Sequence, residues 1–330
     1  NIFSIKNDKS HHKIITFLGI KFKFSNKERL IEEHFNNKIV FLENKLQEYL
    51  QKLKKVIPSK YIDTIELHIV EHCNLNCKGC SHFAPLAQEE FLNIDDYTKD
   101  LKRLYELTHG NIKQFNLLGG EPLLHPQCLE FLRITRKIFP QSIIRLVSNG
   151  ILLPEQNDNF YRTCNKYNVL IAYSEYPIDI DYNKITEKCK QFDVDVMSYG
   201  KRDCFWEDKL NLYGESNVID NFLECKLGWG YENLFFLKQG KLYTCWKAAY
   251  INHFNRYYNK DIPLTQYDYI DIYKVKSIKS VLEFHTKPIP FCAYCEMKTN
   301  VRHPWERSEK KISEWINEIP SETPVVVERE

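Results

Sequence analysis

Residues 73–80 read Cys-Asn-Leu-Asn-Cys-Lys-Gly-Cys, a C-x3-C-x2-C spacing that follows closely on an alternating apolar stretch at residues 65–69. Alternation with a period of two is typical of a β-strand. Three thiolates on one short loop can bind three irons of a 4Fe–4S cube and leave the fourth iron open to a substrate or cofactor. A zinc site is the alternative, with His72 or His82 as the fourth ligand.

Outward from this loop, the chain alternates between strand-like and helix-like segments. Strands are predicted at residues 65–69, 115–118, 143–147, 169–173 and 194–197, and helices at residues 94–108, 128–139, 154–167 and 183–192. Repeated β–α units predict an α/β fold with a parallel sheet, either doubly wound or barrel-like. In barrels of this kind active sites lie at the carboxyl ends of the strands, which is where the cysteine loop falls.

Four successive strand ends carry residues that suit one cofactor: Cys73, Cys77 and Cys80, then Gly119, Gly120 and Glu121, then Ser148 and Asn149 before Gly150, and finally Ser174. Together they resemble the signature of the radical S-adenosylmethionine superfamily. The resemblance implies a partial (β/α)6 TIM-like barrel over residues 61–224. It also implies that the three cysteines bind a catalytic 4Fe–4S cluster, which reduces S-adenosylmethionine to a 5′-deoxyadenosyl radical.

The same resemblance assigns roles to the strand-end residues. The Gly-Gly-Glu stretch is expected to receive the amino group of S-adenosylmethionine, since glycine permits close approach and a carboxylate or carbonyl accepts from an ammonium. The turn at residues 148–150 is expected to contact the ribose, with Ser174 joining the same site. The family commonly places an aromatic residue before the third cysteine, against adenine. This chain has Gly79 there, so the packing is expected from Phe83 or Leu75.

A second set of cysteines lies downstream and comprises Cys225, Cys245, Cys292 and Cys295. A β-hairpin is predicted at residues 234–245 and a helix at residues 277–285. This layout resembles the twitch module, the short form of the SPASM domain. The resemblance implies an auxiliary 4Fe–4S cluster, fully bound by cysteine, within residues 225–305. A zinc ribbon and four unrelated core cysteines remain open as alternatives.

The remaining cysteines show no such pattern. Cys128, Cys164 and Cys189 fall in or near predicted helices and are interpreted as structural. Cys204 follows the fifth predicted strand, on the side where a substrate would enter. A structural role is the favoured interpretation for Cys204, and a role as catalytic hydrogen-atom donor is the alternative.

Composition limits the functional classes. The chain has 330 residues, 43% of them hydrophobic, and a formal net charge of +2, so charge predicts neither nucleic-acid nor membrane binding. No apolar run reaches the roughly 20 residues of a membrane span, and residues 1–13 lack the apolar core of a secretory signal. With 11 cysteines and no export signal, a cytoplasmic protein with metal-binding cysteines is expected.

The two ends of the chain lie outside the resemblance. Residues 1–60 are predicted as a helical extension, in which one helix runs from about residue 26 to residue 55. A heptad seam on that helix comprises Ile39, Leu42, Leu46, Tyr49, Leu53 and Val56. A helix packed on its own domain is favoured, and a dimer through residues 26–56 is the alternative. Residues 306–330 are predicted as a C-terminal tail. The stretch at residues 17–22 resembles a short leader of bacterial surface-polysaccharide proteins.

These expectations lead to a functional hypothesis. The enzyme is expected to abstract hydrogen from a carbohydrate or sugar nucleotide and to dehydrogenate it, with reduced flavodoxin or ferredoxin as electron donor. A sugar epimerase or dehydratase is the nearest alternative. A maturase of ribosomal peptides is disfavoured, because the N-terminal region shows no strand triplet of a peptide-binding domain. A non-catalytic iron–sulfur or zinc protein remains, but it gives no reason for Gly119, Gly120 and Glu121 at a strand end.

Overall fold

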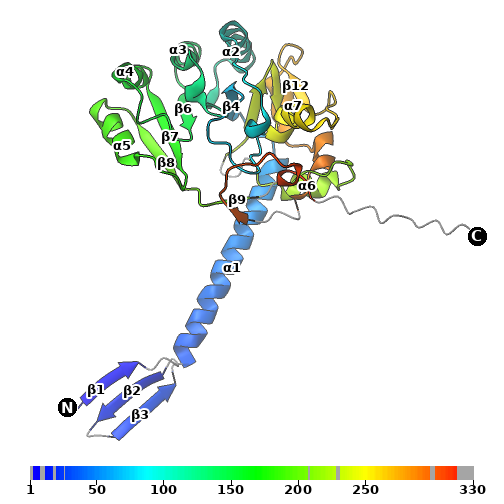
Figure 1. The fold of residues 1–330 in the computed structure, drawn as a ribbon. Helices are drawn as coiled ribbons and strands as arrows, with labels where there is room; N and C mark the ends of the chain where they lie inside the picture. Colours follow the sequence, from blue (N-terminus) through cyan, green and yellow to red (C-terminus); the bar gives the residue numbers. More distant parts are fainter. Residues whose placement is uncertain are drawn as a thin grey trace, which may run out of the picture. The chain divides into compact units, whose positions relative to one another are not determined.

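The computed structural model describes residues 3–7, 12–17, 20–25, 27–206, 209–227, 231–297 and 302–317. The chain divides into two compact units, residues 1–54 and residues 55–330 (Figure 1). No helix in the described part of the chain is both long enough and apolar enough to cross a membrane.

The smaller unit contains a three-stranded antiparallel sheet and most of a long helix. The strands β1 (Phe3–Asn7), β2 (His12–Phe17) and β3 (Ile20–Ser25) pair in chain order, and α1 spans Lys27–Val56. The helix agrees with the prediction. The prediction of a purely helical extension without a strand triplet is wrong. Residues 20–25 alternate apolar and polar side chains, and this pattern forms a strand once a neighbouring strand supplies hydrogen bonds.

The larger unit is built on an eight-stranded sheet with the order β12-β11-β10-β4-β5-β6-β7-β8. Six neighbouring strands are parallel: β10 (Leu234–Lys238), β4 (Ile62–Val70), β5 (Ile112–Gly119), β6 (Ile143–Ser148), β7 (Val169–Glu175) and β8 (Val196–Lys201). The predicted α/β class with a mostly parallel sheet is confirmed. The sixth parallel strand departs from chain order, because β10 pairs with β4 rather than with β8.

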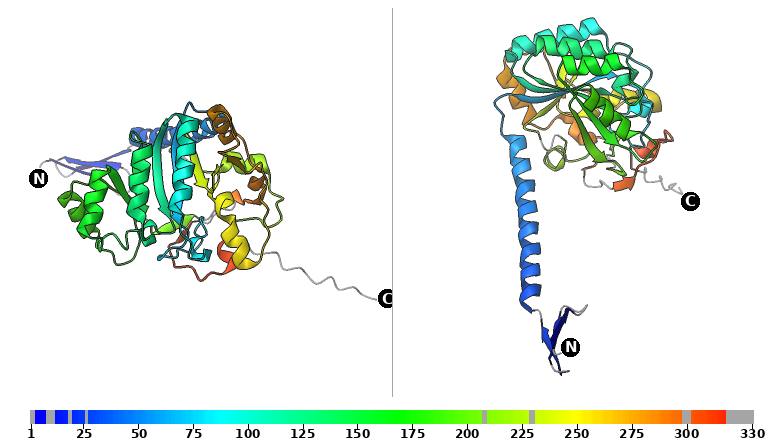
Figure 2. Two further views of the ribbon diagram at one scale, coloured as in Figure 1. Left: turned by 90° about the horizontal axis from the view of Figure 1, so that it is seen from above. Right: turned by 90° about the vertical axis from the view of Figure 1, so that its left-hand side faces the viewer.

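Helices follow the strands and cover one face of the sheet (Figure 2). They are α2 (Ile94–Thr108), α3 (Cys128–Ile138), α4 (Asp158–Lys166) and α5 (Tyr182–Gln191). Leu104 and Phe131 of these helices belong to the main hydrophobic core together with Leu67 and Phe115 of the strands. Burial of such apolar side chains is the main interaction that holds the helices to the sheet. Cys128, Cys164 and Cys189 are buried in the same core, in agreement with their structural interpretation.

A second core forms around a helix that the sequence did not predict. The predicted hairpin is present as β10 and β11 (Lys241–Tyr243), and β12 (Tyr269–Asp271) extends it. Next comes α7 (Trp246–Tyr258), whose many aromatic residues suit a strand as well as a helix by local preference. Tyr250 and Phe254, four positions apart, are both fully buried in this core with Phe83 and Trp315. Tertiary burial therefore selects the helix.

The segment after the C-x2-C motif folds back onto the larger unit. Between the hairpin and this segment lie α8 (Ile278–His285) and a 3-10 turn, η3 (Pro290–Tyr294), after the short helix α6 (Val218–Glu224). The strand β13 (Arg302–Pro304) pairs with β9 (Cys204–Trp206), and the last described turn is η5 (Ile312–Glu314).

The predicted tail is therefore shorter than expected. Trp315 is 1% exposed, and the backbone N–H of Lys78 donates to the carbonyl oxygen of Glu306. The prediction of a tail is wrong for residues 306–317, because apolar burial and backbone pairing hold them in place. Residues 318–330 lie outside the described part of the chain.

Candidate functional site

The loop that carries Cys73, Cys77 and Cys80 begins three residues after β4 ends. Its backbone passes through the left-handed region at Asn76, with φ of 55°, and at Gly79, with φ of 64°. Glycine adopts this conformation at little cost, whereas a bulky aromatic residue would be strained there. Gly79 therefore suits the left-handed conformation that the loop adopts just before Cys80.

Burial raises the pKa of all three thiols on this loop, to about 11 for Cys73. The charge of a Cys80 thiolate would further raise the pKa of Cys73 and Cys77, so these sulfurs lie within electrostatic range of one another. Buried thiols are neutral in the absence of a metal, but a cationic metal centre stabilises the thiolate form and so promotes loss of the proton. The donor set therefore fits an iron–sulfur cluster.

The described residues contain no group of three His, Cys, Asp or Glu side chains that converge on one metal ion. A 4Fe–4S cube attaches each cysteine to a different iron, so its ligands need not converge on a single point.

Several N–H groups donate to the loop, and two of the donor residues, Trp305 and Trp315, were not singled out from the sequence. The backbone N–H of Leu75 and the amide of Asn149 donate to Cys73 Sγ at 3.4 and 3.5 Å. Trp305 Nε1 donates to Cys77 Sγ at 3.2 Å, and Trp315 Nε1 donates to the carbonyl oxygen of Cys80 at 2.9 Å. Hydrogen bonds to cluster sulfurs tune reduction potentials, which makes these donors candidate functional residues.

The stretch Gly119-Gly120 at the end of β5 packs directly against the start of the cysteine loop. A Cβ atom on Gly120 would lie 2.0 Å from the carbonyl oxygen of His72, and one on Gly119 would lie 2.1 Å from that of Val70. The N–H of Gly120 donates to the carbonyl oxygen of Val70 at 2.9 Å. Both glycines are therefore required by backbone contact within the protein.

Glu121 is fully buried and accepts three hydrogen bonds from the protein itself. Ser148 Oγ and the backbone N–H of Asn149 each donate to it at 2.8 Å, and the N–H of Leu123 donates at 3.2 Å. Burial raises the pKa of Glu121 to about 7, although these donors oppose the shift. The carboxylate is thus occupied, which leaves backbone carbonyls of the Gly-Gly-Glu stretch as acceptors for an ammonium group.

Asn149 ties the end of β6 to the cysteine loop. Its side-chain amide donates to Asn74 Oδ1 at 2.7 Å in addition to Cys73 Sγ, and its Oδ1 accepts from the N–H of Ile151. The structure therefore brings Glu121, Ser148 and Asn149 together beside Cys73, three of the residues predicted for the cofactor site.

The end of β7 contributes Ser174, which accepts a hydrogen bond from Arg202 Nε at 3.4 Å. Two residues later comes Tyr176, which the sequence did not single out. Its ring centroid lies 5.9 Å from that of Trp305, and a hydrogen bond from Tyr176 opposes the rise that burial causes in the pKa of Cys77. Both rings therefore lie beside the cysteine loop.

The two residues expected to pack on adenine are buried within the protein. Phe83 is 1% exposed, and its ring contacts those of Phe254 and Trp315 in the second core. Leu75 is equally buried. Both side chains are thus packed inside the protein, and their contact with adenine stays a prediction. Tyr176 and Trp305 are two further aromatic residues beside the loop.

Cys204 lies at the start of β9 and is exposed. It pairs in register with Pro304, the residue before Trp305, and the N–H of Trp305 donates to the carbonyl oxygen of Asp203 at 2.8 Å. The β9–β13 ribbon thus links Cys204 to the segment that contacts Cys77.

The second cysteine set gathers around one cavity. Cys225, Cys245, Cys292 and Cys295 come from the end of α6, the end of β11 and the η3 turn, and all four line this cavity. Burial raises the pKa of Cys292 to about 12 and holds that of Cys245 well above its usual value. Asn221 Nδ2 donates to the carbonyl oxygens of Cys292 and Cys295 at 2.8 and 2.7 Å, which fixes the C-x2-C turn.

Two lysines accompany these four cysteines. Lys55 lines the cavity and donates to the carbonyl oxygens of Phe222 and Cys225. Burial lowers the pKa of Lys55, whereas thiolates at Cys225, Cys292 and Cys245 would raise it. Lys247 Nζ lies 3.9 Å from Cys295 Sγ. Ammonium groups at this place would offset the negative charge of a cluster bound by four thiolates.

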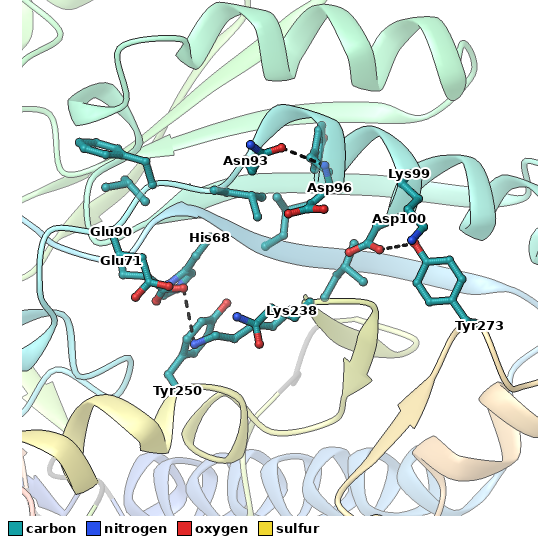
Figure 3. A pocket seen from close by; sticks show the side chains of 17 residues that line it. His68, Glu71, Glu90, Asn93, Asp96, Lys99, Asp100, Lys238, Tyr250 and Tyr273 are labelled. Atoms are coloured by element: carbon teal, nitrogen blue, oxygen red, sulfur yellow. Dashed lines mark hydrogen bonds and ion pairs between the residues drawn. The ribbon is translucent and has the colours of Figure 1, made fainter.

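A further cavity of about 410 Å³ opens where β4 and β10 diverge (Figure 3). Glu71 lines it and contacts His68 at 3.1 Å, His253 at 2.8 Å and Lys238 at 3.5 Å. Burial opposes ionisation of Glu71, but charge interactions and hydrogen bonds with these partners hold its pKa well below the usual range. The residues lining this cavity include none of the seven candidate ligand cysteines and none of the predicted cofactor residues.

Comparison with known proteins agrees with this geometry. Residues 64–190, which include the loop of three cysteines, match a family model described as a 4Fe-4S single cluster domain. The same region carries the glycine stretch and the β6 turn in the order predicted. This match agrees with the resemblance of these residues to the radical S-adenosylmethionine superfamily.

Curated relatives match parts of the chain. A GTP 3',8-cyclase of Staphylococcus epidermidis is 24% identical over 180 residues, which is 51% of this chain and 52% of the cyclase. The corresponding enzymes of Microcystis aeruginosa and Petrotoga mobilis are 28% and 30% identical over 104 and 94 residues. The matches span about a third to a half of these relatives' length.

Solved structures show weaker likeness. BtrN in complex with AdoMet and 2-DOIA gives a TM-score of 0.48 at 13% identity, covering 72% of this chain and 94% of BtrN. SuiB of Streptococcus suis bound to its precursor peptide SuiA gives a TM-score of 0.37 at 12% identity, covering 86% and 87%.

Proposed function

We propose that this chain is a radical S-adenosylmethionine oxidoreductase with two 4Fe–4S clusters that dehydrogenates a hydroxyl-bearing, sugar-like substrate. The observation that carries the proposal is the pair of separate cysteine sets. Three cysteines lie on the loop after β4, and four line a cavity beyond the parallel strands. When bound, the first cluster and S-adenosylmethionine would supply a radical able to remove hydrogen from an unactivated C–H bond.

The chain's own residues would position and shield the cofactors. Cys73, Cys77 and Cys80 would hold the catalytic cluster, and the backbone carbonyls at Gly119 and Gly120 would accept the ammonium of S-adenosylmethionine. Asn149 would keep the cysteine loop at the end of β6, because its amide already bonds Cys73 Sγ and Asn74. Tyr176 and Trp305 would limit water at the loop.

The four-cysteine cavity supports oxidation as the outcome. Removal of one hydrogen atom leaves a substrate carbon radical, which becomes a carbonyl carbon only if a second electron and the hydroxyl proton leave. A cluster held by Cys225, Cys245, Cys292 and Cys295 is a suitable one-electron acceptor. Reduced flavodoxin or ferredoxin would supply the first electron from outside.

A peptide substrate is the second candidate. The three-stranded sheet β1–β3 removes the reason for disfavouring a peptide maturase, since that argument relied on the absence of strands in residues 1–25. Incubation with sugar nucleotides and with peptides, scored by substrate-dependent 5′-deoxyadenosine formation, separates the two classes. Stimulation by peptides alone would overturn the carbohydrate proposal.

Metal content tests the cofactor assignment. Anaerobically reconstituted protein should contain about eight irons, two cubes' worth. Replacement of Cys73, Cys77 and Cys80 by alanine should remove half of the iron and all 5′-deoxyadenosine formation. Cleavage of S-adenosylmethionine by the triple variant would refute the catalytic site. One zinc and four irons in the wild type would refute the auxiliary cluster alone.

Replacement of Cys292 and Cys295 tests the second cluster. The parallel strands and the first cysteine loop are complete without these residues, so the variant should retain uncoupled cleavage of S-adenosylmethionine while it loses product. Retention of full substrate turnover by this variant would show that the electron acceptor lies elsewhere.

The fate of the substrate radical separates dehydrogenation from epimerisation. An epimerase returns a hydrogen atom to the opposite face, and exposed Cys204 is the candidate donor. The reaction is run in deuterium oxide with the wild type and Cys204→Ala. A carbonyl product formed equally by both proteins supports dehydrogenation. Deuterium at one substrate carbon in the wild type, absent with the variant, identifies an epimerase.

A further inference from the structure

Helix α1 carries an apolar stripe with the spacing of a coiled coil. The stripe comprises seven residues at alternating intervals of four and three: Phe35, Ile39, Leu42, Leu46, Tyr49, Leu53 and Val56. Side chains at such intervals lie along one side of a helix, because each pair of steps advances about two turns. In Figure 1, α1 is one continuous helix, so this side runs unbroken along it.

The stripe is exposed along its whole length. The seven side chains are between 39% and 63% exposed, although all are large and apolar. A single exposed apolar side chain is ordinary on a protein surface. A continuous row of seven is not, because exposure of this much apolar surface to water is unfavourable. From Phe35 to Val56 the row spans roughly 30 Å of helix at 1.5 Å per residue. That is three complete heptads, the length at which coiled coils become stable.

We propose that α1 pairs with α1 of a second copy of this chain in a parallel two-stranded coiled coil. Ile39, Leu46 and Leu53 occupy the a positions, while Phe35, Leu42, Tyr49 and Val56 occupy the d positions. Each side chain would insert between four residues of the facing helix. An interface of this kind is isologous, because every residue faces its own counterpart across a two-fold axis.

Charges beside the stripe select the parallel orientation. The g positions all carry lysine, at Lys38, Lys45 and Lys52, whereas Glu43 occupies an e position. In an antiparallel pair g faces g, which would place the lysines of the two chains opposite one another. In a parallel pair g faces the following e, so Lys38 of each chain meets Glu43 of the other. Like charges repel and opposite charges attract across such contacts.

Leu50, at another e position, strengthens a parallel seam. Leu50 is 42% exposed and lies next to Tyr49 at the edge of the stripe. In the parallel pair Lys45 of one chain would face Leu50 of the other, and the aliphatic stem of lysine can cover an apolar side chain. This contact widens the apolar surface that pairing buries.

The primary test is the mass of the full-length protein in solution, measured by sedimentation over a range of concentrations. The wild type should be a dimer. Leu42→Lys with Leu46→Lys should weaken association by roughly a hundredfold or more, because four leucines would leave the interface. Gln51→Lys at an outward f position is the matched control and should remain dimeric. A monomeric or trimeric wild type, or equal dissociation of the control, would overturn the proposal.

The orientation has its own test, which uses surface positions that do not threaten folding. Lys38→Glu and Glu43→Lys should each weaken the dimer several-fold at low salt, because each creates a like-charged contact. The double variant restores opposite charges and should recover most of the affinity. If the double variant loses dimer affinity by the product of the two single fold-losses, the parallel pairing is refuted. Iron content, unchanged in all variants, shows that residues 55–330 remain folded.

Discussion

At the scale of single residues, an indole nitrogen contacts a candidate ligand sulfur. Trp305 Nε1 donates to Cys77 Sγ, whereas Trp315 Nε1 donates to a backbone carbonyl of the same loop. A hydrogen bond to a ligand sulfur stabilises the more negative, reduced cluster and raises its potential. The two tryptophans therefore offer a comparison between a bond to sulfur and a bond to the backbone.

Trp305→Phe should lower the reduction potential of the catalytic cluster by tens of millivolts, the order expected from the loss of one weak hydrogen bond. Redox titration followed by electron paramagnetic resonance measures the potential. Iron content shows whether the variant still binds its clusters. Trp315→Phe is the control, since it leaves every bond to sulfur in place. An equal shift in both variants would mean that the potential responds to loop packing and not to the N–H···S bond.

At the scale of the element, the ends of β4 and β5 touch through their backbones. Gly120→Ala would force a Cβ atom to within 2.0 Å of the His72 carbonyl oxygen, directly before Cys73. Backbone cannot yield as a flexible side chain can, so a loss of about 2–4 kcal/mol in stability is expected, together with loss of the catalytic iron. Thermal unfolding and iron analysis measure both quantities.

Gly200→Ala is the matched control for that substitution. Its φ of 77° is also positive, but a Cβ atom there meets nothing within 4 Å. The control should cost about 1 kcal/mol from backbone strain and should keep all its iron. If Gly120→Ala behaves like the control, the close contact between the two strand ends is not what positions the cysteine loop.

Neighbouring strands also align a polar layer. Glu66 of β4, Asn116 of β5 and Arg145 of β6 stand in register, and Asn116 Nδ2 donates to Glu66 Oε1 at 2.7 Å. Burial raises the pKa of Glu66 to about 7, against the opposing effects of Asn116 and Arg145. A carboxyl group whose pKa is higher in the folded state stabilises the fold at low pH, and this contribution is lost as the pH rises through about 7.

Glu66→Gln should therefore gain stability relative to the wild type as the pH rises. Between pH 5 and pH 8 the relative gain should be about 1–2 kcal/mol, after allowance for the partial exposure of the side chain. At pH 5 the two proteins should be similar, since glutamine mimics the protonated acid. Urea unfolding at both values measures the change. A difference that is independent of pH would show that Glu66 does not titrate in this range.

At the scale of the whole molecule, the far end of the chain closes over the first cysteine loop. Ser308 donates its N–H to the carbonyl oxygen of Asn76 at 2.8 Å, and Arg307 donates to that of Leu75 at 3.1 Å. More than 200 residues separate the partners in sequence. A cluster at this loop would be shielded from oxygen only when residues 302–317 are in place.

Ser308→Pro removes the N–H that bonds Asn76 and should expose the catalytic cluster. We expect several-fold faster bleaching in air, because one of the backbone bonds that hold residues 302–317 over the loop is lost. Ser308→Ala is the control: both variants lose the hydroxyl that donates to Glu314, but alanine keeps the backbone N–H. Visible absorbance after exposure to air measures the rate. Equal rates in the two variants would exclude closure by this backbone pairing.

The sequence alone determined whatever depends on local pattern. Period-two stretches identified the parallel strands β4–β8, and the loop at residues 73–80 could be placed at the end of β4, because strand periodicity and cysteine spacing are properties of contiguous residues. The long helix α1 was predicted for the same reason. The three N-terminal strands were not predicted, since a short antiparallel sheet depends on strand pairing as well as on alternation.

Only the tertiary structure decided which distant residues meet. The pairing of β10 with β4, the helix at residues 246–258 and the contacts of Trp305 and Trp315 with the cysteine loop all depend on surfaces that exist only after folding. Glu121 illustrates the limit at one residue: its motif predicted a ligand for an ammonium, but burial turned its carboxylate onto Ser148 and Asn149. Hydrogen-bond satisfaction in a buried site is a property of the surroundings, which no local pattern encodes.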